Sequence, residues 1–298
     1  MEDTAFGRQL ALDPDPAVAG RYVTELSDAW NCPFVPHGGL ATAVATRAME
    51  LELGVPGQPL RSVTNVFAAQ VPAGPVVIDV TVLRRGRSMS QVAATMRAAD
   101  AHVGHTSVAV FGATRPGFEF TDVFMPSVPP PDECPSFRDE APPGAQERPD
   151  FNFWEQVEGR AAAGHAPWEE YVPTTSERGA WYRFDEPPML DDGALHPLAL
   201  VTLCDTMPGA VGERLGPAQI SWFPPSADLT VHVFGRAECE WVLARNRARI
   251  AGDGYASVEI ELWDPGRAEL VAYGTQLMFF NFPDGAPAPE HLLPSDVR

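Results

Sequence analysis

The sequence predicts an α+β protein in which one order of elements occurs twice. In each half of the chain a strand-like segment precedes one long apolar helix, and several β-rich segments follow that helix. Between the halves lies a segment dense in proline and acidic residues, which can continue neither a sheet nor a helix. We therefore expect two repeats, residues 1–115 and 151–298, joined by a linker over residues 116–150 that lies on the surface.

The first repeat begins with a strand and a helix. RYVTEL at 21–26 has the composition of a strand, and PHGGLATAVATRAMELEL at 36–53 predicts a helix that opens with two glycines. Three β-rich runs follow this helix, at residues 61–70, 75–86 and 88–112.

The second repeat has the same order of elements. AWYRFDE at 180–186 predicts a strand, and DDGALHPLALVTLCDTM at 191–207 predicts a second apolar helix. Four β-rich runs follow this helix, at residues 219–235, 239–254, 255–264 and 269–282.

Both helices are apolar nearly all round, so other parts of the chain must cover most of their surface. Burial contributes roughly 25 cal/mol per Å² of apolar surface, and the antiparallel sheet of the same repeat is available to provide it. A sheet curled around a central helix is the hotdog architecture, and two copies in one chain make a double hotdog. Their sheets could pair edge to edge and so protect each other's edge strands. A pair of unrelated α+β domains is the alternative, which the repeated order of elements disfavours.

The composition excludes several functional classes. The net charge of −19 and the pI of about 4.6 disfavour nucleic acid and anionic membranes as partners, because repulsion opposes both. All 21 basic residues are arginines, so Schiff-base and nucleophilic chemistry on a lysine is excluded. The four cysteines form no C-x-x-C pair and have no histidine at metal-ligand spacing, which predicts free thiols and no metal site.

The sequence also bears on where the protein is found. Its first residues contain no basic region followed by an apolar run, and no stretch of about 18 apolar residues occurs anywhere. We therefore expect a soluble cytoplasmic protein.

Three polar residues lie in apolar surroundings. Asp205 lies in the apolar run LVTLCDTMPGAV, where it is either a helix-terminal acid that reaches solvent before Pro208 or a buried acid with a polar partner. Two later strands carry candidate partners. Ser226 begins the alternating run SADLTVHV, and Gln276 is a lone amide in YGTQLMFF. A buried glutamine must find hydrogen-bond partners, which could be the backbone, a hydroxyl, a carboxylate or a water.

These segments resemble the acyl-CoA thioesterase II (TesB-like) family. In the second half the similarity runs through LCDTMPGAV, SWFPPSADLTVHVF and EWVLARNRARIAGDGYASVEIELWDPGRAELVAYGTQLMFF. In the first half it runs through HGGLATAVATRAM and RRGRSMSQVAATMRA. The resemblance covers residues 22–282 apart from the linker. It implies a double hotdog whose hydrolytic site contains an Asp on the second helix and a Thr and a Gln on two later strands.

By this resemblance the catalytic residues are Asp205, Ser226 and Gln276, with Ser226 in the place of the family's threonine. Serine keeps the hydroxyl but loses the methyl group that restricts the rotamer. The implied reaction is hydrolysis of an acyl-CoA to a fatty acid and CoA. Asp205 would act as general base on a water that all three side chains hold. We expect neither a cofactor nor a metal, because CoA is part of the substrate.

Gly38 and Gly39 are candidates for binding the oxyanion of the thioester. They open the first helix, where backbone N–H groups have no partner within the helix. Alternatively, the missing side chains let this helix pack closely on its neighbours. We expect His37 to be a cap or a packing residue.

Three arginines of the run RNRAR, Arg245, Arg247 and Arg249, alternate onto one face of a strand. They would either contact the phosphates of CoA or form a solvated, outward-facing ladder. Exposed sheet faces also lead us to expect that copies can associate into a homo-oligomer. The acyl chain length is not indicated by the sequence.

Other functional classes require other residues or motifs. A hotdog hydratase or dehydratase needs a histidine with an acid, and His196 at a helix start lacks the Asp-x-Asn-Pro…His pattern that we associate with hydratases. A thioesterase of the α/β-hydrolase type needs a G-x-S-x-G motif, which this chain does not contain. A non-catalytic acyl-CoA-binding hotdog protein, with Ser226 as a sign of relaxed constraint, is the remaining alternative.

Overall fold

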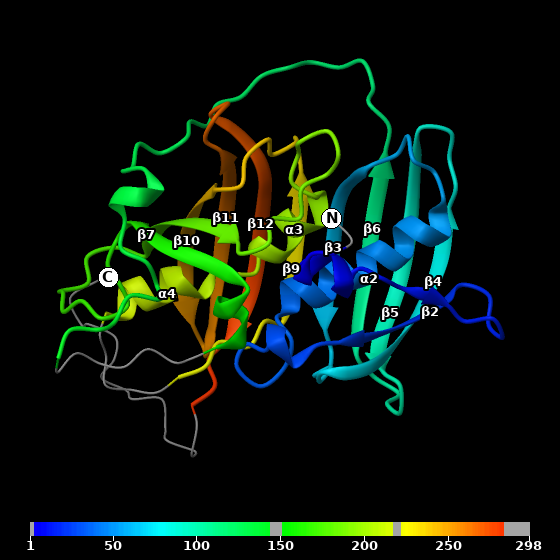
Figure 1. Cartoon of the computed structure of the whole chain (residues 1–298), viewed down its shortest axis with the longest axis horizontal. Helices are drawn as coiled ribbons and strands as arrows, with labels where there is room; N and C mark the ends of the chain where they lie inside the picture. Colours follow the sequence, from blue (N-terminus) through cyan, green and yellow to red (C-terminus); the bar gives the residue numbers. More distant parts are fainter. Residues whose placement is uncertain (1–2, 144–150, 217–221, 283–298) are drawn as a thin grey trace.

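The structure is a computed structural model that describes residues 3–143, 151–216 and 222–282. Its strands form one continuous antiparallel sheet, with the longer helices packed on one face (Figure 1). The first half of the sheet contains, in order, β1 (Asp13–Pro14), β2 (Arg21–Leu26), β4 (Gly74–Arg84), β5 (Met89–Ala98), β6 (His105–Gly112) and β3 (Leu60–Phe67). The second half continues with β9 (Asp228–Val233), β12 (Glu269–Phe279), β11 (Tyr255–Asp264), β10 (Val242–Gly252), β8 (Glu177–Phe184) and β7 (Val157–Ala163).

The two halves meet where β3 pairs with β9. Val63 lies opposite Val231 and Thr64 lies opposite Thr230. Both valines are fully buried beneath the sheet, and the two threonine hydroxyls lie 3.0 Å apart on the other face. The sheets therefore pair edge to edge, as the sequence predicts, and two potential edge strands become central ones.

Helix α2 (Gly38–Leu53) runs across the first half of the sheet and is buried on most sides. Its almost solvent-free residues are Leu40, Ala41, Ala43, Val44, Ala45, Ala48 and Met49. Alanine favours the helix and lets neighbouring elements approach closely, so one helix can contact both the sheet and the second repeat. The helix ends at Gly54, which has a left-handed φ of 59° and donates its N–H to the Glu50 carbonyl.

The second apolar segment differs from the single helix predicted over residues 191–207. Within this range the helix α3 spans only Pro197–Leu203, and a further helix, α4 (Pro208–Leu215), begins directly after the range. Proline has no N–H to donate and is favoured at the first position of a helix, so each helix starts at its proline. Asp205 therefore lies in the connection between the helices. The amide of Asn246 stabilises this connection by donating to the Thr206 carbonyl at 3.2 Å.

Several elements were not indicated by the sequence patterns. They are α1 (Ala5–Gln9), strands β1 and β7, and 3-10 helices at Asp28–Trp30, Pro131–Glu133 and Asn152–Glu155. The run 88–112 also forms two strands, β5 and β6, joined by a turn. No helix within the described residues has both the length and the apolar composition needed to cross a membrane.

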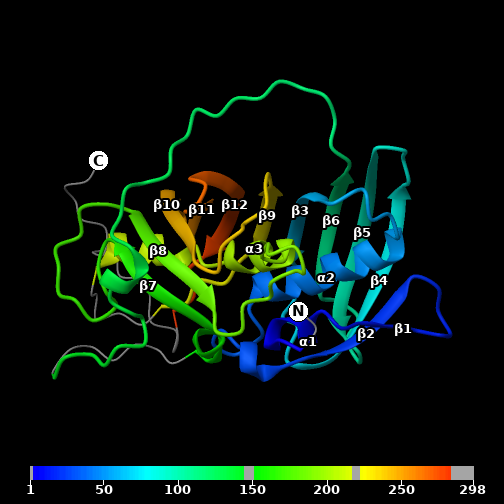
Figure 2. The ribbon, with the colours of Figure 1, turned by 45° about the horizontal axis from the view of Figure 1, so that its top comes forward.

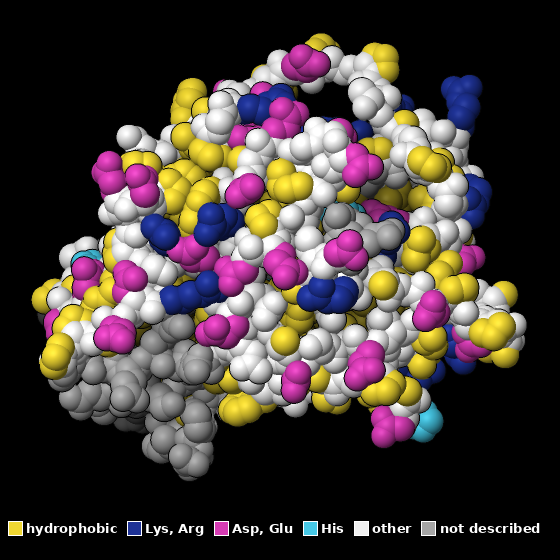
Figure 3. All heavy atoms as spheres, in the orientation of Figure 1, with side chains coloured by type: hydrophobic (Ala, Val, Ile, Leu, Met, Phe, Trp, Pro, Cys, Tyr) yellow, Lys and Arg dark blue, Asp and Glu magenta, His cyan; other side chains and the backbone are white. Residues whose placement is uncertain are grey.

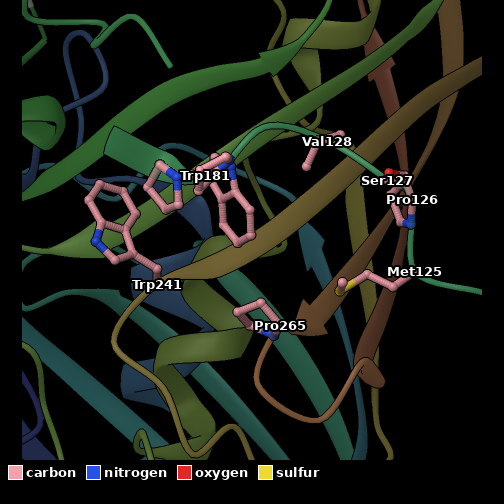
Figure 4. Close-up of a pocket in the computed structure, with 9 residues that line it drawn as sticks. Met125, Pro126, Ser127, Val128, Trp181, Trp241 and Pro265 are labelled. Atoms are coloured by element: carbon pink, nitrogen blue, oxygen red, sulfur yellow. The ribbon is translucent and has the colours of Figure 1, made fainter. Parts of the chain in front are cut away.

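The proline-rich segment that follows β6 arches over the molecule to reach β7 (Figure 2). Residues 125–134 of it lie on the sheet face opposite the helices, over a small apolar cluster that includes Trp181, Leu243 and Trp263, whereas Phe137 packs in the main core. The Trp181 Nε1–H donates to the Pro129 carbonyl at 2.9 Å. Residues of this segment and Trp181 together line a pocket of about 480 Å³ (Figure 4). Residues 144–150 of the predicted linker are outside the described residues.

His196 gives the start of α3 a pH-dependent stability. Its Nδ1 accepts the N–H of Leu198 at 3.2 Å, and burial, followed by the charge of Arg47, lowers its pKa from 6.5 to about 4. The unfolded chain therefore binds more protons between these two pKa values, and the free energy of unfolding falls as the pH drops from about 6.5 to about 4. At roughly 1.4 kcal/mol per pKa unit, His196 contributes on the order of 3 kcal/mol to this fall.

We expect His196→Asn to remove this part of the pH dependence, because asparagine can cap the helix without titrating. Urea unfolding of the wild type and the variant between pH 7.5 and 4.5 measures the difference. Curves of unfolding free energy against pH that stay parallel in the two proteins would contradict the prediction.

Candidate active site

The Asp205 carboxylate is a hydrogen-bond acceptor for groups from both halves of the chain. Its Oδ1 accepts from the Ser226 hydroxyl at 3.2 Å and from the Gln276 Nε2 at 2.5 Å. Its Oδ2 accepts the backbone N–H of Gly39 at 2.8 Å. Asp205 is only 8% exposed, so it is the buried acid with polar partners that the sequence left as one of two alternatives. The structure thus brings the three residues of the carried-over site together.

Neighbouring strands place the two side chains that contact Oδ1. Gln276 lies in β12, and Ser226 lies just before β9, where it forms a bridge with Met278. The Gln276 Nε2 also donates to the Ser226 hydroxyl. The Gln276 Oε1 is buried and accepts no hydrogen bond from the described residues, so this amide has one unused acceptor.

The two glycines allow α2 to begin directly against the end of α3. A Cβ on Gly39 would lie 2.5 Å from the Thr202 carbonyl oxygen and 2.8 Å from the Asp205 Cβ. A Cβ on Gly38 would lie 2.7 Å from the Asp205 Oδ2. The close packing that the sequence offered as one role is therefore present. The Gly39 N–H is used by Asp205, whereas the Gly38 N–H has no acceptor among the described residues.

A cavity of about 650 Å³ opens beside Asp205, and both halves line it. Its walls are largely aromatic and include Phe67, Phe137, Phe153, Trp154, Tyr182 and Trp222. Asp205, Ser226 and Gly38 line the same cavity. A ligand in this space would meet apolar ring faces along most of its length and polar groups near Asp205.

His37 and Cys32 also line the cavity. The His37 ring stacks on Phe153 with centroids 4.0 Å apart, and its Nε2 lies 3.8 Å from the Asp205 Oδ2. Burial lowers the pKa of His37, although the Asp205 charge opposes this, so the imidazole is neutral near pH 7. It makes no side-chain cap at the start of α2 and is a packing residue. Burial raises the pKa of the Cys32 thiol to about 12, which leaves it protonated and weakly nucleophilic.

The three arginines proposed for CoA phosphates lie elsewhere, on the sheet face opposite the helices. Arg245 pairs with Glu261 at 2.7 Å, and Arg247 pairs with Glu177 at 2.9 Å. Arg249 pairs with Glu259. On the face of the molecule shown in Figure 3, acidic side chains lie beside several of the arginines. None of the three arginines lines the cavity, so the structure gives a paired ladder and does not bring them to the site.

Several polar residues of the cavity were not singled out by the sequence analysis, and Arg178 is the charged one among them. Arg178 lies in β8 and lines the cavity. Alternation could have identified it, because Ala180, Tyr182 and Phe184 are buried on the inner face and Arg178 continues their series. The predicted strand began at Ala180 and therefore left Arg178 out.

The described part of the chain contains no cluster of side chains suited to binding a metal ion. No group of three or more His, Cys, Asp or Glu side chains in residues 3–143, 151–216 and 222–282 is arranged to hold a metal ion.

Two family profiles match this chain. The profile of the acyl-CoA thioesterase N-terminal domain matches residues 26–112, and that of the acyl-CoA thioesterase C-terminal domain matches residues 131–280. A search of curated protein sequences found no match.

Solved structures show the same fold. The chain is 27% identical to a conserved protein of unknown function with a hotdog fold from Alicyclobacillus acidocaldarius, with a TM-score of 0.77 over 94% of this chain and 98% of that one. It is 23% identical to a putative thioesterase II from Thermobifida fusca, with a TM-score of 0.75 over 93% and 98% of the two chains. It is 22% identical to the acyl-CoA thioesterase II TesB2 from Mycobacterium marinum, with a TM-score of 0.71 over 94% and 100%.

The C-terminal profile alone spans half of the 298-residue chain, and the N-terminal profile covers most of the first repeat. The protein therefore belongs to the acyl-CoA thioesterase family and is a thioester hydrolase.

Proposed function

We propose that the protein hydrolyses acyl-CoA to a carboxylic acid and CoA by direct attack of a water that Asp205 activates. The observation that carries this proposal is the buried Asp205 carboxylate, which contacts Ser226 and Gln276 at the wall of a cavity large enough for an acyl group. The thiol that lines the cavity, Cys32, stays protonated and is therefore a weak nucleophile. The proposed reaction accordingly uses a water, and no side chain, as the nucleophile.

The three side chains can hold one water in a defined orientation. The water donates one proton to the Asp205 carboxylate and the other to the unused Oε1 of Gln276. The Ser226 hydroxyl turns from its hydrogen bond with the Asp205 Oδ1 and donates to the water oxygen. This arrangement aims a water lone pair away from the carboxylate and into the cavity. Positioning of this kind supplies much of the rate enhancement, and proton transfer to Asp205 supplies a further share.

The Gly38 N–H is suited to stabilise the negative charge on the thioester oxygen. It lies at the first turn of α2, where the helix dipole is positive, and it has no acceptor among the described residues. The water oxygen bonds to the carbonyl carbon, its proton passes to Asp205, and the C–S bond then breaks. CoA leaves as a thiolate, which needs little help from a general acid because an ordinary thiol has a pKa of about 8.5.

We expect Asp205→Asn to lower kcat by roughly 10²- to 10⁴-fold, because an amide cannot accept the proton of the water. Release of free thiol from a series of acyl-CoAs, followed with a thiol-reactive dye, measures the effect. The matched control is Asp192→Asn, since Asp192 is an exposed acid paired with Arg236. Similar activity of the wild type and Asp205→Asn, with both proteins folded, would contradict the proposal.

We expect Ser226→Ala to lower kcat by roughly 10- to 100-fold, because the hydroxyl that orients the water is lost. Ser226→Thr keeps this hydroxyl and should remain within a few-fold of the wild type. The same thiol assay measures both variants. If Ser226→Ala and Ser226→Thr lost activity equally, the hydroxyl would have no role in holding the water.

A further inference from the structure

Arg178 lies in the wall of the cavity, and its guanidinium group has no hydrogen-bond or ion-pair partner among the described residues. Its Nε and Nη2 are both buried and have no hydrogen-bond acceptor among the described residues. No carboxylate of those residues lies within 4.0 Å of its guanidinium nitrogens. A buried cation normally has an ion-pair partner, because removing it from water is otherwise costly.

Another arginine of the chain, Arg21, shows what the Nε and Nη2 side of a guanidinium group binds. Arg21 donates from Nε to the Asp79 Oδ1 at 2.6 Å and from Nη2 to the Asp79 Oδ2 at 3.2 Å. Nε and Nη2 are the two nitrogens that point in parallel and match the two oxygens of a planar carboxylate. In a chain with a net charge of −19, an unpaired edge of this kind is unusual, because acidic partners are abundant.

The surroundings contact the Arg178 side chain but do not neutralise its charge. Its guanidinium carbon lies 4.8 Å from the centroid of the Phe137 ring. A Cβ on Gly209 would lie 3.5 Å from both Cδ and Nη1 of Arg178, so the side chain also lies against the first turn of α4. The positive end of a helix dipole adds to the positive charge of the guanidinium. This part of the cavity therefore favours an anion.

We infer that Arg178 binds a carboxylate at the distal end of the acyl group, so that the preferred substrates are acyl-CoAs with a second carboxyl group. The inference rests on the proposed function, because it assigns a substrate class to the same cavity. Asp205 repels the second carboxylate, and Arg178 attracts it, so the thioester lies at Asp205 and the far end of the acyl group at Arg178. The aromatic walls between them cover the methylene groups.

The acyl carboxylate fits this position better than a phosphate of CoA does. The phosphates are attached to a nucleotide, which is bulky and polar, whereas Arg178 lies among aromatic side chains in a cavity of about 650 Å³. The guanidinium reaches the carboxylate by rotating its terminal torsions away from Phe137 and towards the space that its own side chain lines. Such rotamer changes are common on binding.

The test compares matched acyl-CoAs of equal carbon number, hexanoyl-CoA with adipoyl-CoA and octanoyl-CoA with suberoyl-CoA. The wild type should prefer the carboxylated member of each pair. Arg178→Met should lower kcat/KM for adipoyl-CoA by roughly 100-fold and change that for hexanoyl-CoA by only a few-fold. Arg183→Met is the matched control, since Arg183 lies in the same strand but pairs with Glu158, and it should leave both substrates unchanged.

Two further measurements separate this role from others. Thioesters of N-acetylcysteamine lack phosphates, and the preference for the adipoyl compound should persist with them. If the effect of Arg178→Met disappeared with these compounds, Arg178 would bind a CoA phosphate and the inference would be overturned. Thermal unfolding should show Arg178→Met to be at least as stable as the wild type, whereas a structural arginine would destabilise the protein when replaced.

Direct binding distinguishes failure of this inference from failure of the proposed function. The probe is the quenching of tryptophan fluorescence when adipoyl-CoA or hexanoyl-CoA is added to Asp205→Asn, since Trp154 and Trp222 line the cavity. Tighter binding of adipoyl-CoA that Arg178→Met abolishes would support the role of Arg178 even if nothing were hydrolysed. Hydrolysis of hexanoyl-CoA with no preference for adipoyl-CoA, and equal binding of both, would overturn it and leave the proposed function intact.

Discussion

The hydrogen bond from the Gly39 N–H to the Asp205 carboxylate is the contact on which the rest of the site depends. A carboxylate that is only 8% exposed is stable when charged only if donors replace the water it has lost. Gly39 supplies one such donor from the first repeat, and Ser226 and Gln276 supply two from the second. The hydrogen-bonded carboxylate therefore exists only where both repeats meet, so neither half carries this arrangement alone.

The continuous sheet holds the two repeats together at the site. The pairing of β3 with β9 fixes the two repeats at a distance at which the first turn of α2 contacts the end of α3. That contact leaves no space for a side chain at Gly39, because a Cβ would lie 2.5 Å from the Thr202 carbonyl oxygen. A larger residue would separate the helices and remove the backbone donor from Asp205 together with the close packing. Sheet register, helix packing and the charge state of the base are thus linked through one glycine.

Periodicity within short windows predicted the first apolar helix and the strands, and the repeated order of elements predicted the double hotdog. The edge-to-edge pairing was inferred from the need of two such sheets to protect their edges. The sequence indicated that the second helix ends before Pro208, but it indicated neither the earlier end at Leu203 nor the further helix α4. Arg178 was missed because the strand boundary was placed three residues late. The use of the Gly39 N–H by Asp205 could not be predicted, since it joins residues 166 positions apart, and the pairing of Arg245 with Glu261 likewise depends on strand register.

In the proposed mechanism the two repeats supply different catalytic groups. Both helices start after a histidine, His37 in one repeat and His196 in the other, and Asp205 comes nine residues after its histidine. The residue at the same offset in the first repeat is Thr46, which donates its hydroxyl to the Thr42 carbonyl within the helix and offers no base. Conversely, the second helix begins with Pro197, which has no N–H for an oxyanion. The second repeat therefore supplies the carboxylate, and the first repeat supplies the backbone N–H groups. Together they form a single site, where the start of α2 faces Asp205.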